Sequence, residues 1–503
     1  MRRVGAPSDR VVIVGAGLAG LSAALRLAGA GRQVTVVERE PEVGGRCGVL
    51  RTDGYAFDTG PTVLTMPHLI EDALACIGEG LTDWLDLRPV EPLYRARFAD
   101  GETIDVHASP DAMAEEITRV AGAQNAAGYR RYVRFVTRLY RAEMRDFIDR
   151  NIDSPLDLLT PDLARLIALG GFRRLAPKVA SYLADERLQR LFSFQSLYAG
   201  LSPYDALAIY AVISYMDTVG GVYFPRGGMH AVPRALADAA TKHGVEIRCS
   251  TAVSRVEIAN GRATGVITAD GERIAADVVV LNPDLPIAYR DLLPGVRMPR
   301  RVARQKVSPS CCVLLAGSPR RYDGIAHHNL HIGAAWKQTF EQVIGGGALM
   351  TDPSFLVTNP TRSDPSLAPP GRESYYALFP VPNLTAPLEW TSLAPQYRDE
   401  MVATLEANGY EGFGDAIEVE NLTTPADWAA RGMAAGSPFA AAHSFFQTGP
   451  FRANNLAPVE GVVFTGSGTQ PGVGVPMVLI SGRLAAERIT GPDRHYRHRT
   501  YPR

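Results

Sequence analysis

The fold is decided by the stretch Val11-Val12-Ile13-Val14-Gly15-Ala16-Gly17-Leu18-Ala19-Gly20, an apolar run that leads into a glycine turn. An amphipathic helical pattern follows the turn, and a second apolar run, Val34-Thr35-Val36-Val37, ends at Glu38. The order of strand, glycine turn, helix, strand and acid predicts a βαβ unit of the kind that binds dinucleotides.

Each position of this unit has a physical reason. Gly15 permits a tight turn, Gly17 lets the backbone approach a pyrophosphate, and Gly20 lets the helix pack closely against the strand. The helix N-terminus offers unpaired N–H groups and the positive end of its dipole to the phosphates. Glu38 is placed to accept hydrogen bonds from the ribose hydroxyls. We therefore expect a dinucleotide site over these residues.

The residues after Glu38 indicate which dinucleotide binds. Gly44-Gly45-Arg46 comes first, and the run Gly54-Tyr55-Ala56-Phe57-Asp58-Thr59-Gly60-Pro61-Thr62 follows. In these motifs the chain resembles the FAD-containing amine oxidase and carotenoid desaturase superfamily, and the longer run resembles phytoene desaturases of the bacterial and fungal type. The resemblance implies FAD as the cofactor. It also implies that Gly44, Gly45, Arg46, Pro61 and Thr62 contact FAD.

A second glycine-rich turn, residues 466–476, lies between a predicted strand over residues 462–465 and a predicted helix over residues 477–489. The N-terminus of that helix can stabilise the negative charge of a reduced flavin. We predict flavin contacts at Gly468, Gly474 and Val475. The family often has histidine where this chain has Gln470, which puts a role for an imidazole there in doubt. The resemblance also matches Val253 with a valine whose backbone contacts the adenine.

Composition and charge are those of an ordinary folded protein. The chain has 503 residues, 46% hydrophobic and 21% charged, enough for two or three domains. The net charge of −1 gives no reason to expect nucleic acid as a partner. The five cysteines show no metal or disulfide spacing, so we expect a reducing compartment. Without a signal-peptide pattern or a long apolar run, we expect a cytoplasmic protein.

The resemblance covers residues 11–489 and implies a mixed α/β fold in which the chain passes repeatedly between two domains. One is a Rossmann-like FAD-binding domain of the glutathione-reductase type, and the other is a discontinuous substrate domain with a helical, membrane-associating part. The expected FAD-binding parts are residues 1–75, 223–300 and 456–491. The expected substrate parts are residues 76–222, which include the helical part, and residues 301–455. A tail, residues 492–503, completes the chain.

Residues 163–178 form a basic amphipathic segment. Leu163, Leu166, Ile167 and Phe172 could share an apolar surface, and the neighbouring basic residues are Arg165, Arg173, Arg174 and Lys178. Such a pattern suits docking on a membrane surface. An ordinary helix with one face in the core and a solvated basic side also explains the pattern, and the sequence alone favours it. Both interpretations stay open at the level of sequence.

The function that the resemblance implies is carotenoid desaturation. FAD would take a hydride from an allylic carbon of phytoene, a proton would leave the neighbouring carbon, and repeated rounds would give lycopene. Oxygen or a membrane quinone would reoxidise the flavin, and with a single dinucleotide motif we expect no nicotinamide site. The candidate for the proton acceptor is Asp157, although a helix-capping role suits the same residue.

Other functions remain open from the sequence. The substrate could be another carotenoid or a C30 polyene. An amine oxidase would share the fold, and Lys306 could be its lysine near flavin N5. A non-enzymatic, prenyl-binding relative like the Rab GDP dissociation inhibitors is a further alternative. The pair His327-His328 does not predict a metal site, because neighbouring strand residues point to opposite faces and no carboxylate or cysteine cluster accompanies them.

Overall fold

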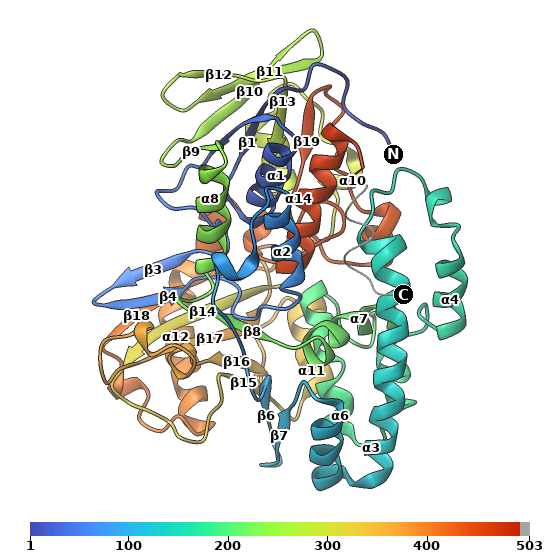
Figure 1. The fold of residues 1–503 in the computed structure, drawn as a ribbon. Coiled ribbons are helices and arrows are strands. Elements are labelled where there is room, and N and C mark those ends of the chain that lie inside the picture. The colour runs from blue at the N-terminus through green and yellow to red at the C-terminus, as the bar shows by residue number, and fades with distance from the viewer. Residues whose placement is uncertain (493–503) are drawn as a thin grey trace.

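The computed structural model describes residues 1–492, and its first layer is a five-stranded parallel sheet in the upper half of Figure 1. In spatial order the strands are β19 (Val462–Phe464), β13 (Val278–Leu281), β1 (Arg10–Val14), β2 (Gln33–Val37) and β9 (Glu246–Arg248). Every residue of β13 is buried, as expected for a parallel strand that is covered on both faces. Stretches that lie far apart in the sequence therefore combine in one sheet.

Helices cover one face of this sheet, and a small antiparallel sheet covers the other. The helices are α1 (Leu18–Gly29), α2 (His68–Ala75), α8 (Ala231–Lys242) and α14 (Val475–Thr490). The small sheet consists of β10 (Val253–Ala259), β11 (Arg262–Thr268) and β12 (Arg273–Ala275). Helices α1 and α14 approach closely because a Cβ on Gly482 would collide with the carbonyl oxygen of Ala19. This contact joins the N-terminal unit to the C-terminal helix.

The second layer is a seven-stranded sheet in the lower half of Figure 1. In spatial order its strands are β18 (Val419–Thr423), β14 (Ser310–Ser318), β17 (Glu373–Val381), β16 (Phe355–Thr358), β15 (His328–Ile332), β6 (Tyr94–Phe98) and β7 (Thr103–Val106). Helix α12 (Trp390–Ala407) packs on one face of the sheet. Two short pairs complete the strands: β3 (Val49–Thr52) with β4 (Tyr55–Asp58), and β5 (Leu87–Pro89) with β8 (Tyr223–Pro225).

A helical segment stands beside the seven-stranded sheet (Figure 1). Its longest helix is α3 (Pro110–Glu143), which changes direction at Gly122, where φ is 81°. The other helices of the segment are α4 (Pro161–Leu169), α5 (Leu175–Ala180), α6 (Glu186–Leu191) and α7 (Ala211–Ser214). Elsewhere within residues 1–492 the chain forms the short α-helices α9 (Leu285–Ile287), α10 (Arg300–Ala303), α11 (Trp336–Phe340) and α13 (Pro425–Ala430).

The basic amphipathic segment differs from its sequence pattern. It contains two helices, because Gly170 adopts a left-handed conformation (φ 74°) and ends α4 before α5 begins at Leu175. Leu166 is buried at 2% exposure, so its predicted place on the outer apolar surface is wrong. Ile167 and Phe172 are exposed, at 60% and 42%. The pattern identified helical structure but misassigned one residue of the outer face.

The described helices include none that is long and apolar enough to cross a membrane. The domain boundaries expected from the resemblance stay predictions. Of the expected tail, residues 493–503 lie outside the described residues.

Candidate functional site

The glycine turn after β1 has no room for side chains. Gly15 has φ 101°, and a Cβ on Gly20 would collide with the Gly15 carbonyl oxygen. A Cβ on Gly17 would lie 2.9 Å from Nδ2 of Asn282, which itself donates a hydrogen bond to the Gly15 carbonyl oxygen at 3.2 Å. The backbone of the turn is therefore bare at the N-terminus of α1, as a pyrophosphate site requires.

Glu38 lies directly after β2, and its carboxylate is held by two backbone N–H groups, one from the glycine turn and one from the residues that follow Glu38. Its Oε2 accepts a hydrogen bond from the Ala16 N–H at 2.7 Å, and its Oε1 accepts one from the Glu40 N–H at 3.0 Å. A carboxylate has about four acceptor sites, so capacity remains for a ribose diol. The Thr251 N–H donates to the Glu38 carbonyl oxygen at 2.7 Å. That bond brings the start of β10, and with it Val253, beside the acid; an adenine contact at Val253 stays a prediction.

The second glycine pair lies against the first turn. The Gly44 N–H donates to the Ala16 carbonyl oxygen at 2.9 Å, and a Cβ on Gly45 would lie 3.3 Å from Cα of Gly17. Arg46 then extends across the site. It donates to Oγ of Ser467 at 2.9 Å and to Oδ1 of Asp284 at 2.7 Å. Arg46 thus connects the chain after β13 with the C-terminal glycine turn.

The C-terminal glycine turn is fixed by a buried arginine. Arg452 is 3% exposed and donates to the carbonyl oxygens of Thr469, at 2.9 Å, and Ser467. Burial lowers the pKa of Arg452 to about 10. Helix α14 begins after Gly474 with no side-chain cap on its first turn, so its N-terminus can stabilise negative charge on a ligand.

Gln470 and a histidine from elsewhere in the chain flank this turn. The Gln470 amide donates to the Gly449 carbonyl oxygen at 3.1 Å and to that of Ile152 at 3.4 Å, so it fastens two segments to the turn. His443 is buried, and its Nε2 accepts the Val473 N–H at 3.5 Å. Burial holds the pKa of His443 well below its usual value, so the imidazole is neutral. The sequence motif search missed His443.

The run that ends at Thr62 is anchored at two points. Asp58 accepts hydrogen bonds from the N–H groups of Met229 at 2.8 Å and His230 at 3.1 Å, and burial raises its pKa to about 6. Thr62 is buried, and its Oγ1 accepts a hydrogen bond from the Thr358 hydroxyl at 3.2 Å. FAD contacts at Pro61 and Thr62 stay predictions.

Asp157 has the contacts of a capping residue. Its Oδ2 accepts hydrogen bonds from the N–H groups of Asp153 at 2.9 Å and Ser154 at 3.0 Å. These bonds lower the pKa of the carboxyl and make it a weaker base. Its role as proton acceptor stays a prediction.

The adjacent histidines make separate contacts. Nδ1 of His327 lies 2.7 Å from the Ser363 hydroxyl, and Nδ1 of His328 lies 3.0 Å from the Thr358 hydroxyl. Across residues 1–492, no three histidine, cysteine or acidic side chains gather as a metal site would require.

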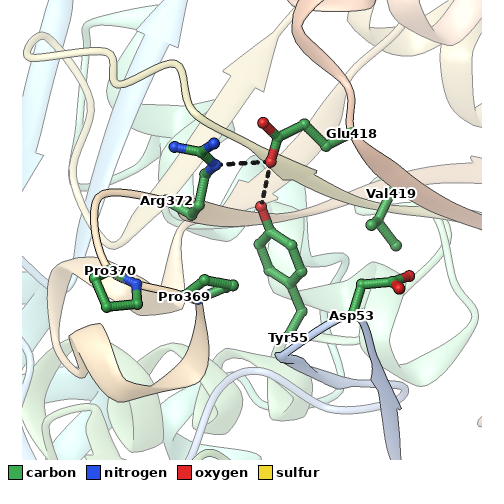
Figure 2. A pocket seen from close by; sticks show the side chains of 7 residues that line it. All are labelled: Asp53, Tyr55, Pro369, Pro370, Arg372, Glu418 and Val419. Carbon is green, nitrogen blue, oxygen red and sulfur yellow. Dashed lines mark hydrogen bonds and ion pairs between the residues drawn. The ribbon is translucent and has the colours of Figure 1, made fainter.

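A separate surface depression lies against the seven-stranded sheet (Figure 2). In it the Tyr55 hydroxyl donates to Glu418 at 3.2 Å, and Arg372 donates to the same oxygen at 2.8 Å. Burial and Glu418 raise the pKa of Tyr55 to about 12. None of the predicted FAD-contacting residues lines this depression. We therefore place the functional site at the glycine turns instead.

Comparison with known proteins identifies the family. The profile described as "Flavin containing amine oxidoreductase" matches residues 18–490. Over 498 residues, 98% of this chain and 97% of the relative, the sequence is 56% identical to "Phytoene dehydrogenase" of Streptomyces griseus. The chain is a flavin-containing amine oxidoreductase of the phytoene desaturase group.

Further relatives support the same family assignment. The "zeta-carotene-forming phytoene desaturase" of Myxococcus xanthus is 38% identical, with 95% of this chain and 93% of the relative covered. Among solved structures, putrescine oxidase bound to putrescine has a TM-score of 0.60 at 17% identity, covering 97% of this chain and 100% of that one. That likeness shows the fold alone. The protein is an FAD-dependent oxidoreductase, as the resemblance implied, and the bare glycine turns, Glu38 and the uncapped α14 fit the cofactor.

Asn282, Asp284 and Arg452 are the site residues that sequence reasoning missed besides His443. Asn282 and Asp284 directly follow β13, a buried parallel strand. The carboxyl ends of parallel strands are where α/β sheets bind ligands, and that rule could have found both residues. No comparable signal marked Arg452.

Proposed function

We propose that the protein is an FAD-dependent carotenoid desaturase that introduces conjugated double bonds into phytoene, with lycopene as the end product. The 56% identity to a phytoene dehydrogenase over nearly the full length of both chains carries this proposal. A relative from Pantoea ananas, "Phytoene desaturase (lycopene-forming)", is 32% identical and supports lycopene as the product.

The parallel sheet supports a Rossmann-like FAD-binding domain of the glutathione-reductase type, built from residues 1–75, 223–300 and 456–491. FAD supplies the acceptor for the hydride that leaves the polyene. The bare glycine turn holds the pyrophosphate, Glu38 orients the ribose, and the N-terminus of α14 stabilises negative charge on the flavin. The remaining tasks of the protein are to position the polyene and to exclude water from the site.

The proposal includes docking on a membrane from the cytoplasmic side, because a C40 hydrocarbon is stored in a bilayer rather than in water. Exposed apolar side chains on and around α4 support this location, with Leu156 and Leu159 both 73% exposed. Oxygen or a membrane quinone is the proposed electron acceptor.

The amine oxidase alternative receives less support. The Lys306 side chain is exposed, and its backbone N–H is bonded to the Gln447 side chain at 2.6 Å. An exposed lysine does not suit a role at the flavin ring.

The decisive experiment supplies purified, FAD-loaded protein with phytoene in liposomes. We expect anaerobic bleaching of the flavin by phytoene alone, without NAD(P)⁺, and lycopene on chromatography after oxygen is admitted. A C30 substrate is assayed in parallel, because a relative named "4,4'-diapolycopene oxygenase" is 31% identical. Faster bleaching by the C30 polyene would reassign the substrate. Peroxide formation with putrescine and no reaction with polyenes would overturn the proposal.

A further inference from the structure

A buried carboxyl without an ion-pair partner lies where the helical segment meets the seven-stranded sheet. Asp217, in the π-helix η6 (Tyr215–Val219), is 2% exposed. Within the described residues neither of its oxygens is in hydrogen-bond geometry, although the Gln195 amide and the Tyr94 hydroxyl face it. Burying an ionised carboxylate without a partner is costly, so the presence of this one calls for a functional explanation.

The groups around Asp217 come from several elements. The titratable side chains that face it are Tyr94 on β6, Tyr198 on the short helix η4 (Phe194–Ala199) and Tyr132 on α3. All are uncharged at neutral pH. Burial holds the pKa of Asp217 well above its usual value. The carboxyl can therefore exchange a proton closer to neutral pH than an exposed aspartate does.

A line of polar groups runs from Asp217 toward the predicted flavin site. The Tyr94 ring lies 5.6 Å from the His328 ring between centroids. Nδ1 of His328 lies 3.0 Å from the Thr358 hydroxyl, which donates to Thr62 at 3.2 Å. Thr62 closes the run predicted to contact FAD. These contacts connect the surroundings of Asp217 with Thr62, whereas Asp157 is capped by backbone groups.

We propose that Asp217 accepts the proton that desaturation releases, with Tyr94 and His328 as the positioning residues that hold it toward the polyene. This inference rests on the proposed function. One C–H bond breaks as a hydride, whose two electrons go to FAD. The C–H bond on the neighbouring carbon then breaks, its electron pair becomes the second bond of the new C=C, and its proton joins the Asp217 carboxylate. Because its surroundings are apolar, the Asp217 carboxylate is a stronger base than a carboxylate in water. Its negative charge also stabilises the positive charge that develops on the polyene.

The test compares Asp217→Asn with Asp217→Glu and with a matched control, Glu143→Gln. Glu143 is also buried, with an unpartnered Oε1, but it lies at the end of α3 and outside the line to Thr62. For Asp217→Asn we expect anaerobic flavin reduction by phytoene to slow at least about 100-fold, the lower end of what a positioned proton acceptor contributes. The bound flavin content stays that of the wild type, Asp217→Glu recovers part of the rate, and Glu143→Gln reacts as the wild type does.

Two further readouts separate proton acceptance from a structural role. The wild-type rate rises with pH as the carboxyl loses its proton, whereas the residual rate of Asp217→Asn is independent of pH. In the infrared difference spectrum between the FAD-loaded wild type and Asp217→Asn, both without substrate, a protonated-carboxyl band titrates at higher pH than that of an exposed aspartate. The subtraction removes the bands of the other buried carboxyls, Asp58 and Glu143, which the two proteins share.

The inference is overturned if Asp217→Asn keeps the wild-type rate and pH profile, or if the difference spectrum between the two proteins shows no titrating carboxyl band. If this variant does not fold, Tyr94→Phe decides, because it removes only a hydroxyl and keeps the ring packing against Phe194. An unchanged pH profile in Tyr94→Phe then overturns the inference. Wild-type protein that ignores phytoene would instead overturn the proposed substrate, and the infrared titration would still decide whether Asp217 exchanges a proton.

Discussion

At the scale of single residues, the bare glycine turn makes FAD binding sensitive to one substitution. In Gly17→Val, a Cβ would lie 2.9 Å from the Asn282 amide, and the branched side chain would occupy space that the pyrophosphate needs. We expect the variant to purify folded but nearly colourless. Absorbance at the flavin bands, set against protein concentration, measures the loss.

Gly345→Val is the matched control for that substitution. Gly345 is exposed, its φ is not in the left-handed region, and no atom lies within 4 Å of an added Cβ. The control should keep its flavin. Stoichiometric flavin in Gly17→Val would mean that the pyrophosphate binds elsewhere.

Asp58 gives the stability a pH dependence that can be measured. Burial raises its pKa from the usual 3.8 to about 6, against the opposing effect of the hydrogen bonds from Met229 and His230. The folded state therefore keeps a proton that the unfolded chain has already lost. This contribution is complete below about pH 4 and is lost as pH rises to about 6, by up to about 3 kcal/mol. Asp58→Asn should abolish the loss.

Urea unfolding at both ends of this pH window checks the prediction. Other groups also titrate there, so the decisive quantity is the difference between the wild type and Asp58→Asn. A midpoint that shifts equally in the two proteins would show that Asp58 ionises in the folded state as it does in water.

At the scale of elements, the local sequence pattern was sufficient to predict the βαβ unit. The predicted strand, turn, helix and second strand correspond to β1, α1 and β2, and Glu38 follows directly. Each of these signals lies within a few residues in the sequence, where side-chain periodicity and glycine spacing act. The partners of the unit could not be found in this way. Asn282 and Asp284 reach it from more than 230 residues away.

The segment at α4 shows what a local sequence pattern cannot predict. Amphipathic periodicity located helical structure correctly, but it cannot say which face the rest of the protein covers. Leu166 packs inward because α4 lies against α3, and Ile167, next in the chain, points to solvent. Gly170 then redirects the chain, so that Phe172 lies on the link between α4 and α5.

At the scale of the whole molecule, exposed apolar side chains gather on two segments. Around α4 these are Leu156, Leu159, Ile167 and Phe172. In residues 445–451, the exposed rings of Phe445, Phe446 and Phe451 contact one another, with centroids 5.2 to 5.8 Å apart. Gln470 bonds to both Ile152 and Gly449. Gln470 therefore links the chain just before Leu156 and the chain at Gly449 to the turn that leads into α14.

This arrangement predicts how the protein docks on a membrane. We expect Ile167 and Phe172 to enter the interface while exposed Arg165, Arg173 and Arg174 meet anionic headgroups, each arginine contributing about 1 kcal/mol. Burying one phenylalanine adds about 2 kcal/mol, so Phe172→Asp should weaken binding to anionic liposomes by at least about 10-fold. Sedimentation with liposomes measures binding, which should also weaken as salt increases. Turnover of liposome-borne phytoene should fall in parallel while flavin content stays constant.

Leu384→Asp is the matched control, because Leu384 is also exposed, at 38%, but lies on the loop after β17. It should bind liposomes as the wild type does. If Phe172→Asp binds and turns over normally while Phe446→Asp does not, the aromatic segment 445–451 is the docking surface and α4 lies outside the membrane. Wild-type protein that ignores liposomes would exclude both surfaces, and the polyene would then have to reach the site by a carrier. The two phenylalanine variants therefore decide which of the two segments docks on the membrane.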